Sequence, residues 1–325
     1  MPTLAPQSLG AFVVSAGFLG DVACFALGDG TVHLIGAEPQ VVQAHKGSVL
    51  AASSSRDGRS LITSGDDGRV VQISGDGALE VLAERPRKWI DILATGPDGV
   101  VAFASGRTAW TRDRNGVEKE FAIERAVGGL AFAPKGMRLA MARYGGATLY
   151  WVNTTGKPVD LAWAGAHNAV IWSPDGKYVV TSMQENALHG WRLADGQDMR
   201  MTGYPTKVKS MSWTVRGKYL ATSGAAATIL WPFIGKSGPM GQEPLQLGAR
   251  GEGDLVTFVA CHPQEEAIAI GYQDGLVLAS RFQDGAERVL RRPGDGPVSS
   301  LAWSADGMKL AFGTEEGAAG VIALP

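Results

Sequence analysis

The stretch Asn168–Met201 reads NAVIWSPDGKYVVTSMQENALHGWRLADGQDMRM, and it decides the fold. An apolar run, Ala169–Trp172, meets the sequence Ser-Pro-Asp-Gly at residues 173–176. This is a tight-turn signal, because Pro presets φ, Asp bonds to nearby backbone and Gly accepts a positive φ. A β-branched run, Tyr178–Thr181, follows, and two further turns flank the run Ala187–Trp191. The pattern predicts four short strands joined by three turns, an antiparallel meander.

The same pattern recurs along the whole chain. The second strand of each copy is expected near Val22, Leu61, Val100, Leu139, Val179, Leu220, Ala267 and Leu310, in steps of 39, 39, 39, 40, 41, 47 and 43 residues. A period of about 40 residues made of four strands is typical of a β-propeller blade. We therefore predict an all-β protein built from one repeated unit.

The repeats predict one propeller domain over residues 1–325, with eight four-stranded blades. Seven blades are the alternative, if repeat 1 or repeat 3 does not form a full blade. The last repeat has three strands, so we expect the N-terminal piece, residues 3–10, to complete it and close the ring, because closure removes exposed sheet edges. The expected repeats are residues 11–47, 48–88, 89–126, 127–167, 168–207, 208–253, 254–296 and 297–325 plus 3–10.

One segment ties the repeats to a known family. Residues Leu61–Ile73 read LITSGDDGRVVQI, which resembles the signature of the second and third strands in WD-repeat (WD-40) β-propellers. The chain resembles a degenerate, bacterial-type cytosolic member of that family, and it lacks a Trp-Asp dipeptide throughout. The resemblance implies a scaffold that assembles protein partners.

The family pattern also implies a buried network of His, Ser or Thr, Asp and Trp in each blade. Repeat 2 offers three of the four groups, with Ile73 at the Trp position, and repeat 5 has Glu where Asp is expected. Trp110, Trp151 and Trp231 hold or approach the Trp position elsewhere. The residues that the resemblance assigns to these structural networks are His45, Thr63 and Asp67 in repeat 2, and His167, Thr181, Glu185 and Trp191 in repeat 5.

Net charge, apolar runs and cysteine number limit the partners and the location that we expect for this chain. The net charge of −2 gives no global basic field, so we do not expect nucleic acid as the partner. No apolar run approaches the ~20 residues of a membrane span. A positively charged leader is absent from the sequence and only two cysteines, Cys24 and Cys261, occur, so we expect a cytoplasmic protein with free thiols.

The sequence carries no recognisable catalytic or metal-binding motif. It has no Gly-x-Ser-x-Gly elbow, no His-Glu-x-x-His and no Cys-x-x-Cys. Its five histidines are scattered, whereas metal ligands must converge. We therefore predict a protein that is not an enzyme and that has no catalytic residues, no metal and no cofactor.

The candidate binding surface comes from the connections between blades. These loops and the neighbouring corners concentrate basic and aromatic residues on repeats 3 and 4, whereas Asp29, Asp274, Glu315 and Glu316 lie on repeats 1, 7 and 8. Arg with aromatic residues is the composition of interface hot spots. The residues predicted to bind a partner are Arg85, Arg87, Lys88, Trp89, Arg107, Arg125, Arg143 and Tyr144.

The leading hypothesis is a non-catalytic WD-repeat scaffold that binds one or more protein partners through its loop face. One alternative is a lyase or hydrolase that uses the central channel, where a small-molecule ligand would meet Asp91, Lys209 and Thr257. Another is a sensor that binds acidic or phosphorylated peptide segments on the basic loops.

Overall fold

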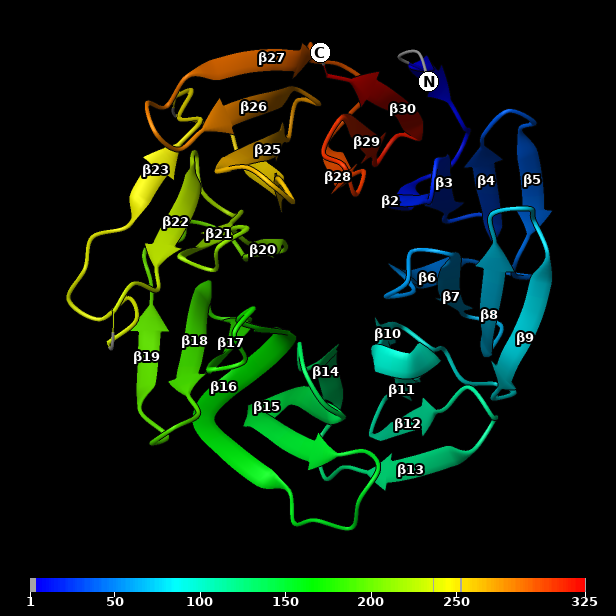
Figure 1. Cartoon of the computed structure of the whole chain (residues 1–325), viewed down its shortest axis with the longest axis vertical. Coiled ribbons are helices and arrows are strands. Elements are labelled where there is room, and N and C mark those ends of the chain that lie inside the picture. Colours follow the sequence, from blue (N-terminus) through cyan, green and yellow to red (C-terminus); the bar gives the residue numbers. More distant parts are fainter. Residues whose placement is uncertain (1–3, 236, 252, 325) are drawn as a thin grey trace. The chain divides into compact units, whose positions relative to one another are not determined.

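The computed structural model describes residues 4–235, 237–251 and 253–324. Over this range the chain is all-β, with 30 strands and one three-residue 3-10 turn, η1 (Pro97–Gly99) (Figure 1). Neighbouring strands within the described sheets run antiparallel, as in β10–β11 and β28–β29. No helix in the described part of the chain is long and apolar enough to cross a membrane.

The chain divides into two compact units. The first unit runs from the N-terminus to Gln40 and from Tyr204 to the C-terminus, and the second is Val41–Gly203. The chain passes from the first unit to the second within the fifth strand. Each unit consists of antiparallel sheets, and the two are described separately below.

The sheets of the first unit each have four strands. One sheet has the order β1 (Leu4–Ser8), β30 (Ala318–Ala323), β29 (Lys309–Thr314) and β28 (Val298–Trp303). A second has β2 (Val13–Leu19), β3 (Val22–Leu27), β4 (Thr31–Ile35) and β5 (Gln40–Gln43). The other two are β20 (Met211–Trp213), β21 (Tyr219–Thr222), β22 (Thr228–Pro232) and β23 (Leu245–Leu247), and then β24 (Val256–Cys261), β25 (Ala267–Tyr272), β26 (Val277–Arg281) and β27 (Glu287–Arg291).

The second unit holds two four-stranded sheets and one of six strands. The first has β6 (Val49–Ser54), β7 (Ser60–Gly65), β8 (Arg69–Ser74) and β9 (Leu79–Glu84), and the next has β10 (Ile92–Thr95), β11 (Val101–Ser105), β12 (Thr108–Arg112) and β13 (Glu118–Ala122). The six-stranded sheet has β14 (Val127–Phe132), β15 (Arg138–Trp151), β16 (Val159–Trp172), β17 (Tyr178–Met183), β18 (Ala187–Arg192) and β19 (Asp198–Met201).

The N-terminal strand completes the last repeat. Leu4 pairs with Val321, Ser8 pairs with Ala318, and the Leu9 N–H donates to Gly317 O at 2.8 Å. Figure 1 shows β1 lying along β30. The predicted completion of the last sheet is therefore confirmed for the described residues. Thr3, the first residue of the predicted piece, lies outside them.

The described residues form seven separate sheets. This number agrees with the alternative prediction of seven blades and not with the leading prediction of eight. The difference arises in repeats 4 and 5, which share the six-stranded sheet. The N–H of Val152 donates to Met137 O at 2.9 Å, so the two ends of β15 meet and the strand folds back on itself. The bend lies at Gly145 and Gly146, whose φ values of 87° and 129° suit glycine. Each repeat keeps its strand segments, but β16 pairs with β15 at one end and β17 at the other.

The first turns of repeats 2, 5 and 8 follow one local design. In repeat 5, Ser173 Oγ donates to Asp175 Oδ1 at 2.7 Å, and the same oxygen accepts the Lys177 N–H at 3.0 Å. The Ser55–Asp57 and Ser304–Asp306 turns repeat this arrangement. The carboxylate thus substitutes for backbone partners in the turn, which explains why the Asp-Gly signal recurs.

Apolar residues fill both faces of the sheets. All six residues of β7 are buried, and Ile62, Val70, Phe103 and Trp110 pack in one cluster of the second unit. In the first unit, β25 is lined by Ile268 and Ile270 on one face and Ala269 on the other. Strands buried on both faces explain the near-continuous apolar runs in the sequence.

Candidate protein-interaction surface

The structural network of repeat 2 is assembled from three elements. His45 is buried, and its Nδ1 lies 2.9 Å from Asp67 Oδ1 while its Nε2 lies 2.9 Å from Thr63 Oγ1. Burial alone would raise the pKa of Asp67, but hydrogen bonds from His45, Lys46 N–H and Arg69 N–H outweigh it and lower that pKa. The network fixes the loop before β6 against the β7–β8 turn.

Repeat 5 builds a different network from the residues assigned to it. His167 Nδ1 lies 2.7 Å from Thr181 Oγ1, and its Nε2 lies 3.1 Å from the carbonyl of Trp163. Glu185 does not take the Asp place on the imidazole, since its carboxylate instead accepts the Ala166 N–H at 3.3 Å. The Trp191 ring is buried 5.7 Å from the His167 ring.

Repeat 6 holds a third network that the sequence pattern does not reveal. Trp231 Nε1 donates to the Tyr204 hydroxyl at 2.6 Å, and this hydroxyl lies 2.7 Å from Thr222 Oγ1. Burial raises the pKa of Tyr204 to about 12, so the phenol stays neutral. Tyr204 therefore bonds to the network threonine as His45 and His167 do in repeats 2 and 5. Its only sequence signal is its distance before Thr222, which matches the spacing of His45 and Thr63.

The strand registers identify the Trp position of each repeat. Trp191 pairs with Val179, Trp231 with Leu220, and Ile73 with Leu61. In repeat 3 the corresponding residue, opposite Val101, is Arg112 and not Trp110. In repeat 4 the bond from Val152 to Met137 places Tyr150 at this position, one residue before Trp151.

Two of the basic residues predicted to bind a partner are engaged within the protein. The Arg85 guanidinium pairs with Glu118 and lies 4.9 Å from the ring centre of Trp110. Arg143 donates to Asp160 Oδ1 at 2.9 Å and to Thr148 Oγ1 at 2.9 Å. The hydrogen bond from Thr148 and then that from Arg143 lower the pKa of Asp160, although burial opposes them. Both arginines therefore support the loops.

The turn after β9 presents the most exposed of the predicted residues. Lys88 N–H donates to Arg85 O at 3.1 Å, with Pro86 second in the turn and Arg87 third at φ 65°. This is the pattern of a type II turn, which favours Gly at the third position. Arg87, Lys88 and Trp89 are all exposed, and Trp89 keeps 69% of its surface accessible. No hydrogen bond or ion pair engages the Arg87 or Trp89 side chain within the described residues.

A second cluster lies on repeats 3 and 4. The Arg125 guanidinium carbon lies 5.9 Å from the ring centre of Tyr144, which is 58% exposed. The loop of Arg125 is bonded to the β11–β12 turn of Arg107, because Ile123 N–H donates to Arg107 O at 2.9 Å. Arg125 and Tyr144 also line a hollow of about 350 Å³ with Asn168. The structure thus brings Arg107, Arg125 and Tyr144 onto one surface.

The acidic residues on repeats 1, 7 and 8 serve partly in their own turns. Asp29 Oδ1 accepts the Thr31 N–H at 3.0 Å, and Asp274 pairs with Arg250 at 2.9 Å. Glu315 lines a cavity of about 340 Å³ in the first unit with Lys209 and Thr257. The Thr257 hydroxyl donates to Val298 O at 2.7 Å, so it is held by the main chain.

The described residues contain no group of three or more His, Cys, Asp or Glu side chains that could hold a metal ion. The two thiols, Cys24 and Cys261, are free, and burial raises the pKa of each to about 12. At neutral pH they are therefore protonated packing groups, because the thiolate is the reactive form.

Comparison with known proteins tests the resemblance to a family. Residues 36–73 match the WD40 family, described as WD domain, G-beta repeat. The resemblance to the WD-repeat family is confirmed. The chain is also similar in structure to the C-terminal WD40 domain of Sif2, with a TM-score of 0.78 and 15% identity over 100% of this chain and 99% of that one. A computationally designed protein, Ika8, matches with a TM-score of 0.78 and 17% identity over 98% of both chains.

The fold of the chain is therefore a β-propeller, as the repeats predict. WD40 propellers generally serve as protein-interaction scaffolds, and they generally bind protein partners. A shared fold does not by itself establish function, so the function of this chain must be argued from its surface.

Proposed function

We propose that this β-propeller is a non-catalytic scaffold in the cytoplasm, which binds a protein partner through the exposed loops from the end of repeat 2 to repeat 4. The observation that carries the proposal is the turn of Arg87. A non-glycine residue in left-handed backbone costs roughly 1–2 kcal/mol, and such strain clusters where a side chain has a function. Here the strained residue projects an unpaired guanidinium beside the exposed Trp89.

The charge of the surface supports an acidic segment as the partner. Arg87, Lys88, Arg107 and Arg125 have no ion pair among the described residues, whereas the arginines that support the loops are paired. Unpaired positive charges steer an acidic partner and set its orientation, and Trp89 and Tyr144 supply apolar area for hot-spot contacts. A phosphorylated segment would satisfy the same groups.

Two observations favour this surface over catalysis in the channel. The Thr257 hydroxyl is occupied by main-chain carbonyls. Lys209 is exposed to solvent and is not enclosed in the way a catalytic base or nucleophile usually is. The buried thiols, with their raised pKa values, are consistent with the proposed reducing cytoplasm.

A photo-crosslinking residue tests the proposed surface directly. With p-benzoylphenylalanine in place of Trp89, we expect a crosslinked partner in native lysate. The matched control carries it in place of Trp151, which is 40% exposed in strand β15. Crosslinking of the same protein at equal yield from Trp151, or from neither site, would exclude this surface as the docking site.

A further inference from the structure

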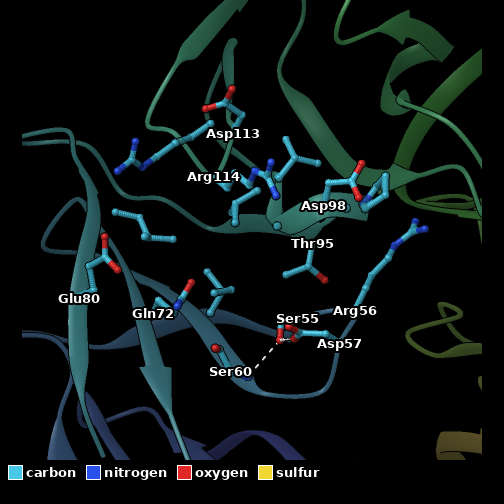
Figure 2. Close-up of a pocket in the computed structure, with 18 residues that line it drawn as sticks. Ser55, Arg56, Asp57, Ser60, Gln72, Glu80, Thr95, Asp98, Asp113 and Arg114 are labelled. Carbon is cyan, nitrogen blue, oxygen red and sulfur yellow. Dashed lines mark hydrogen bonds between the residues drawn. The ribbon is translucent and has the colours of Figure 1, made fainter.

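A second feature lies between repeats 2 and 3 of the second unit. A cavity of about 700 Å³ is lined by β7, β8 and β9 on one side and by the turns around η1 and after β12 on the other (Figure 2). Ile62 and Leu82 give it an apolar floor, and the rest of the wall is mainly polar. None of its residues belongs to the loop surface proposed above.

The cavity exists because an arginine replaces the tryptophan at the Trp position of repeat 3. In repeat 5, Trp191 fills this position and packs against Ala140 and Leu149 of the preceding repeat. In repeat 3, Arg112 stands there, opposite Val101. A guanidinium is more hydrated than an indole and cannot fill an apolar space, so the volume next to repeat 2 stays open.

Several polar groups of the wall already have partners. Arg56 donates to the carbonyl oxygens of Ala133 and Pro134 at 2.7 and 3.2 Å. Asp57 accepts from Ser55 Oγ at 2.6 Å, and Asp113 accepts the Val117 N–H at 2.8 Å. These side chains hold the turns and are not available to a ligand.

The remaining charged groups are unpaired. Arg112, Arg114, Glu80 and Asp98 line the cavity, and no hydrogen bond or ion pair engages their side chains in the described part of the chain. The amide of Gln72 is likewise free. Figure 2 shows Glu80 and Gln72 on the side of β8 and β9, with Arg114 and Asp98 across the hollow. Two free cations and two free anions therefore face one space.

Asp98 gives a separate indication of a ligand. In repeats 2, 5 and 8 the aspartate of the first turn accepts a hydrogen bond from a serine two residues earlier. Repeat 3 has Gly96 in place of that serine, and Asp98 adopts a φ of 54°. The Asp98 carboxylate therefore makes no such bond within the turn and lies beside the cavity, and the residue has a left-handed backbone that costs energy.

We propose that this cavity binds a small zwitterionic molecule of the dipeptide class. Arg112 and Arg114 bind its carboxylate, since guanidinium and carboxylate groups form bidentate hydrogen bonds. Glu80 and Asp98 bind its ammonium group, and Gln72 bonds to its peptide group. A molecule with one charge of each sign gives the cations and the anions of the site a partner each and leaves its net charge unchanged, whereas an anion alone would face the two free carboxylates.

Isothermal titration calorimetry with the dipeptide Ala-Ala tests the proposal on the full chain. We expect saturable binding at millimolar or lower concentration. N-acetyl-Ala-Ala lacks the ammonium group and Ala-Ala-amide lacks the carboxylate, and each is expected to bind at least tenfold more weakly. No binding of Ala-Ala at about 10 mM, or equal binding of either blocked analogue, would overturn the proposal.

Matched variants locate the binding. Arg112→Ile places at the Trp position the residue type that Ile73 and Ile322 supply in repeats 2 and 8, so the fold is expected to persist. This variant and Glu80→Gln should each weaken Ala-Ala binding at least tenfold, whereas Glu287→Gln, an exposed position in β27, should leave it unchanged. Undiminished binding by a folded Arg112→Ile protein would assign the ligand to another site.

Discussion

The buried imidazole of His189 makes the stability of the propeller depend on pH. The ring is fully buried and stacks on Trp163 with ring centres 3.9 Å apart. Neither ring nitrogen has a hydrogen-bond partner within the described residues. Burial, and then the charges of His167 and Arg200, lower the pKa of His189 to about 3.

The direction and size of the effect follow from this shift. In the unfolded chain the imidazole has a pKa of about 6.5 and binds a proton first as the pH falls. The folded state is therefore fully favoured above pH 6.5, and each pH unit below that costs about 1.4 kcal/mol until the folded pKa is reached. Between pH 8 and pH 5, we expect His189 alone to remove about 2 kcal/mol from the free energy of unfolding.

Urea denaturation of the wild type and of His189→Phe at both pH values isolates this group. Phenylalanine keeps a ring against Trp163 but does not titrate. The difference in unfolding free energy between the two proteins should shift by about 2 kcal/mol in favour of the variant at pH 5. Other titrating groups cancel in this difference.

One carboxylate provides the competing outcome. Asp198 Oδ1 lies 3.5 Å from His189 Nε2, but the Asp198 side chain is half exposed and solvent screens its charge. If the wild type instead gained stability over the variant at pH 5, Asp198 would be stabilising a charged imidazole. A difference that stayed constant within about 0.5 kcal/mol would equally refute the reasoning, since surface changes alone reach that size.

Three further predictions concern single side chains. Tyr204→Phe should lower the free energy of unfolding by about 1–3 kcal/mol, because the Trp231 N–H loses its buried acceptor, while Tyr219→Phe should change it by under about 0.5 kcal/mol in the same urea titration. Lys119→Met removes the ammonium group that donates to three carbonyls, those of residues 151, 152 and 154. Amide hydrogen exchange in residues 152–158 should therefore accelerate. Unchanged protection there would show that the ammonium group does not order the loop. Arg87→Gly should raise the midpoint of thermal unfolding and the free energy of unfolding by roughly 0.5–1 kcal/mol, because the relief of left-handed backbone strain exceeds the entropy cost of ordering glycine. A lower midpoint would show that the Arg87 backbone is not strained.

Local turn chemistry made the strand arrangement predictable. Asp-Gly turns such as that of Asp175 recur in phase, and the structure shows the carboxylate bonds that favour them. The networks of His45 and His167 were expected from the resemblance to WD-repeat propellers, and the structure shows the His–Thr contact of each.

Other features depend on contacts that the sequence pattern does not encode. Repeats 4 and 5 share a sheet because β16 runs without a break from repeat 4 into repeat 5 and pairs first with β15 and then with β17. The pairing of Arg143 with Asp160 needed the register of β15 against β16. The sequence pattern does not show that Arg112 occupies the Trp position of repeat 3, because the first turn of this repeat is shorter than those of repeats 2, 5 and 8. It closes from Gly96 N–H to Val100 O, which shifts the Trp position from Trp110 to Arg112.

Charge reversal on the loop surface tests the proposed scaffold most directly. Affinity capture from native lysate would compare the wild type with Arg87/Lys88/Arg125→Glu and with a matched control, Lys135/Lys157/Arg200→Glu, whose residues are also exposed. We expect a stoichiometric protein partner with the wild type and the control, and we expect this binding to be weakened by salt and lost in the loop variant. Equal capture by all three proteins, or capture by none, would contradict it.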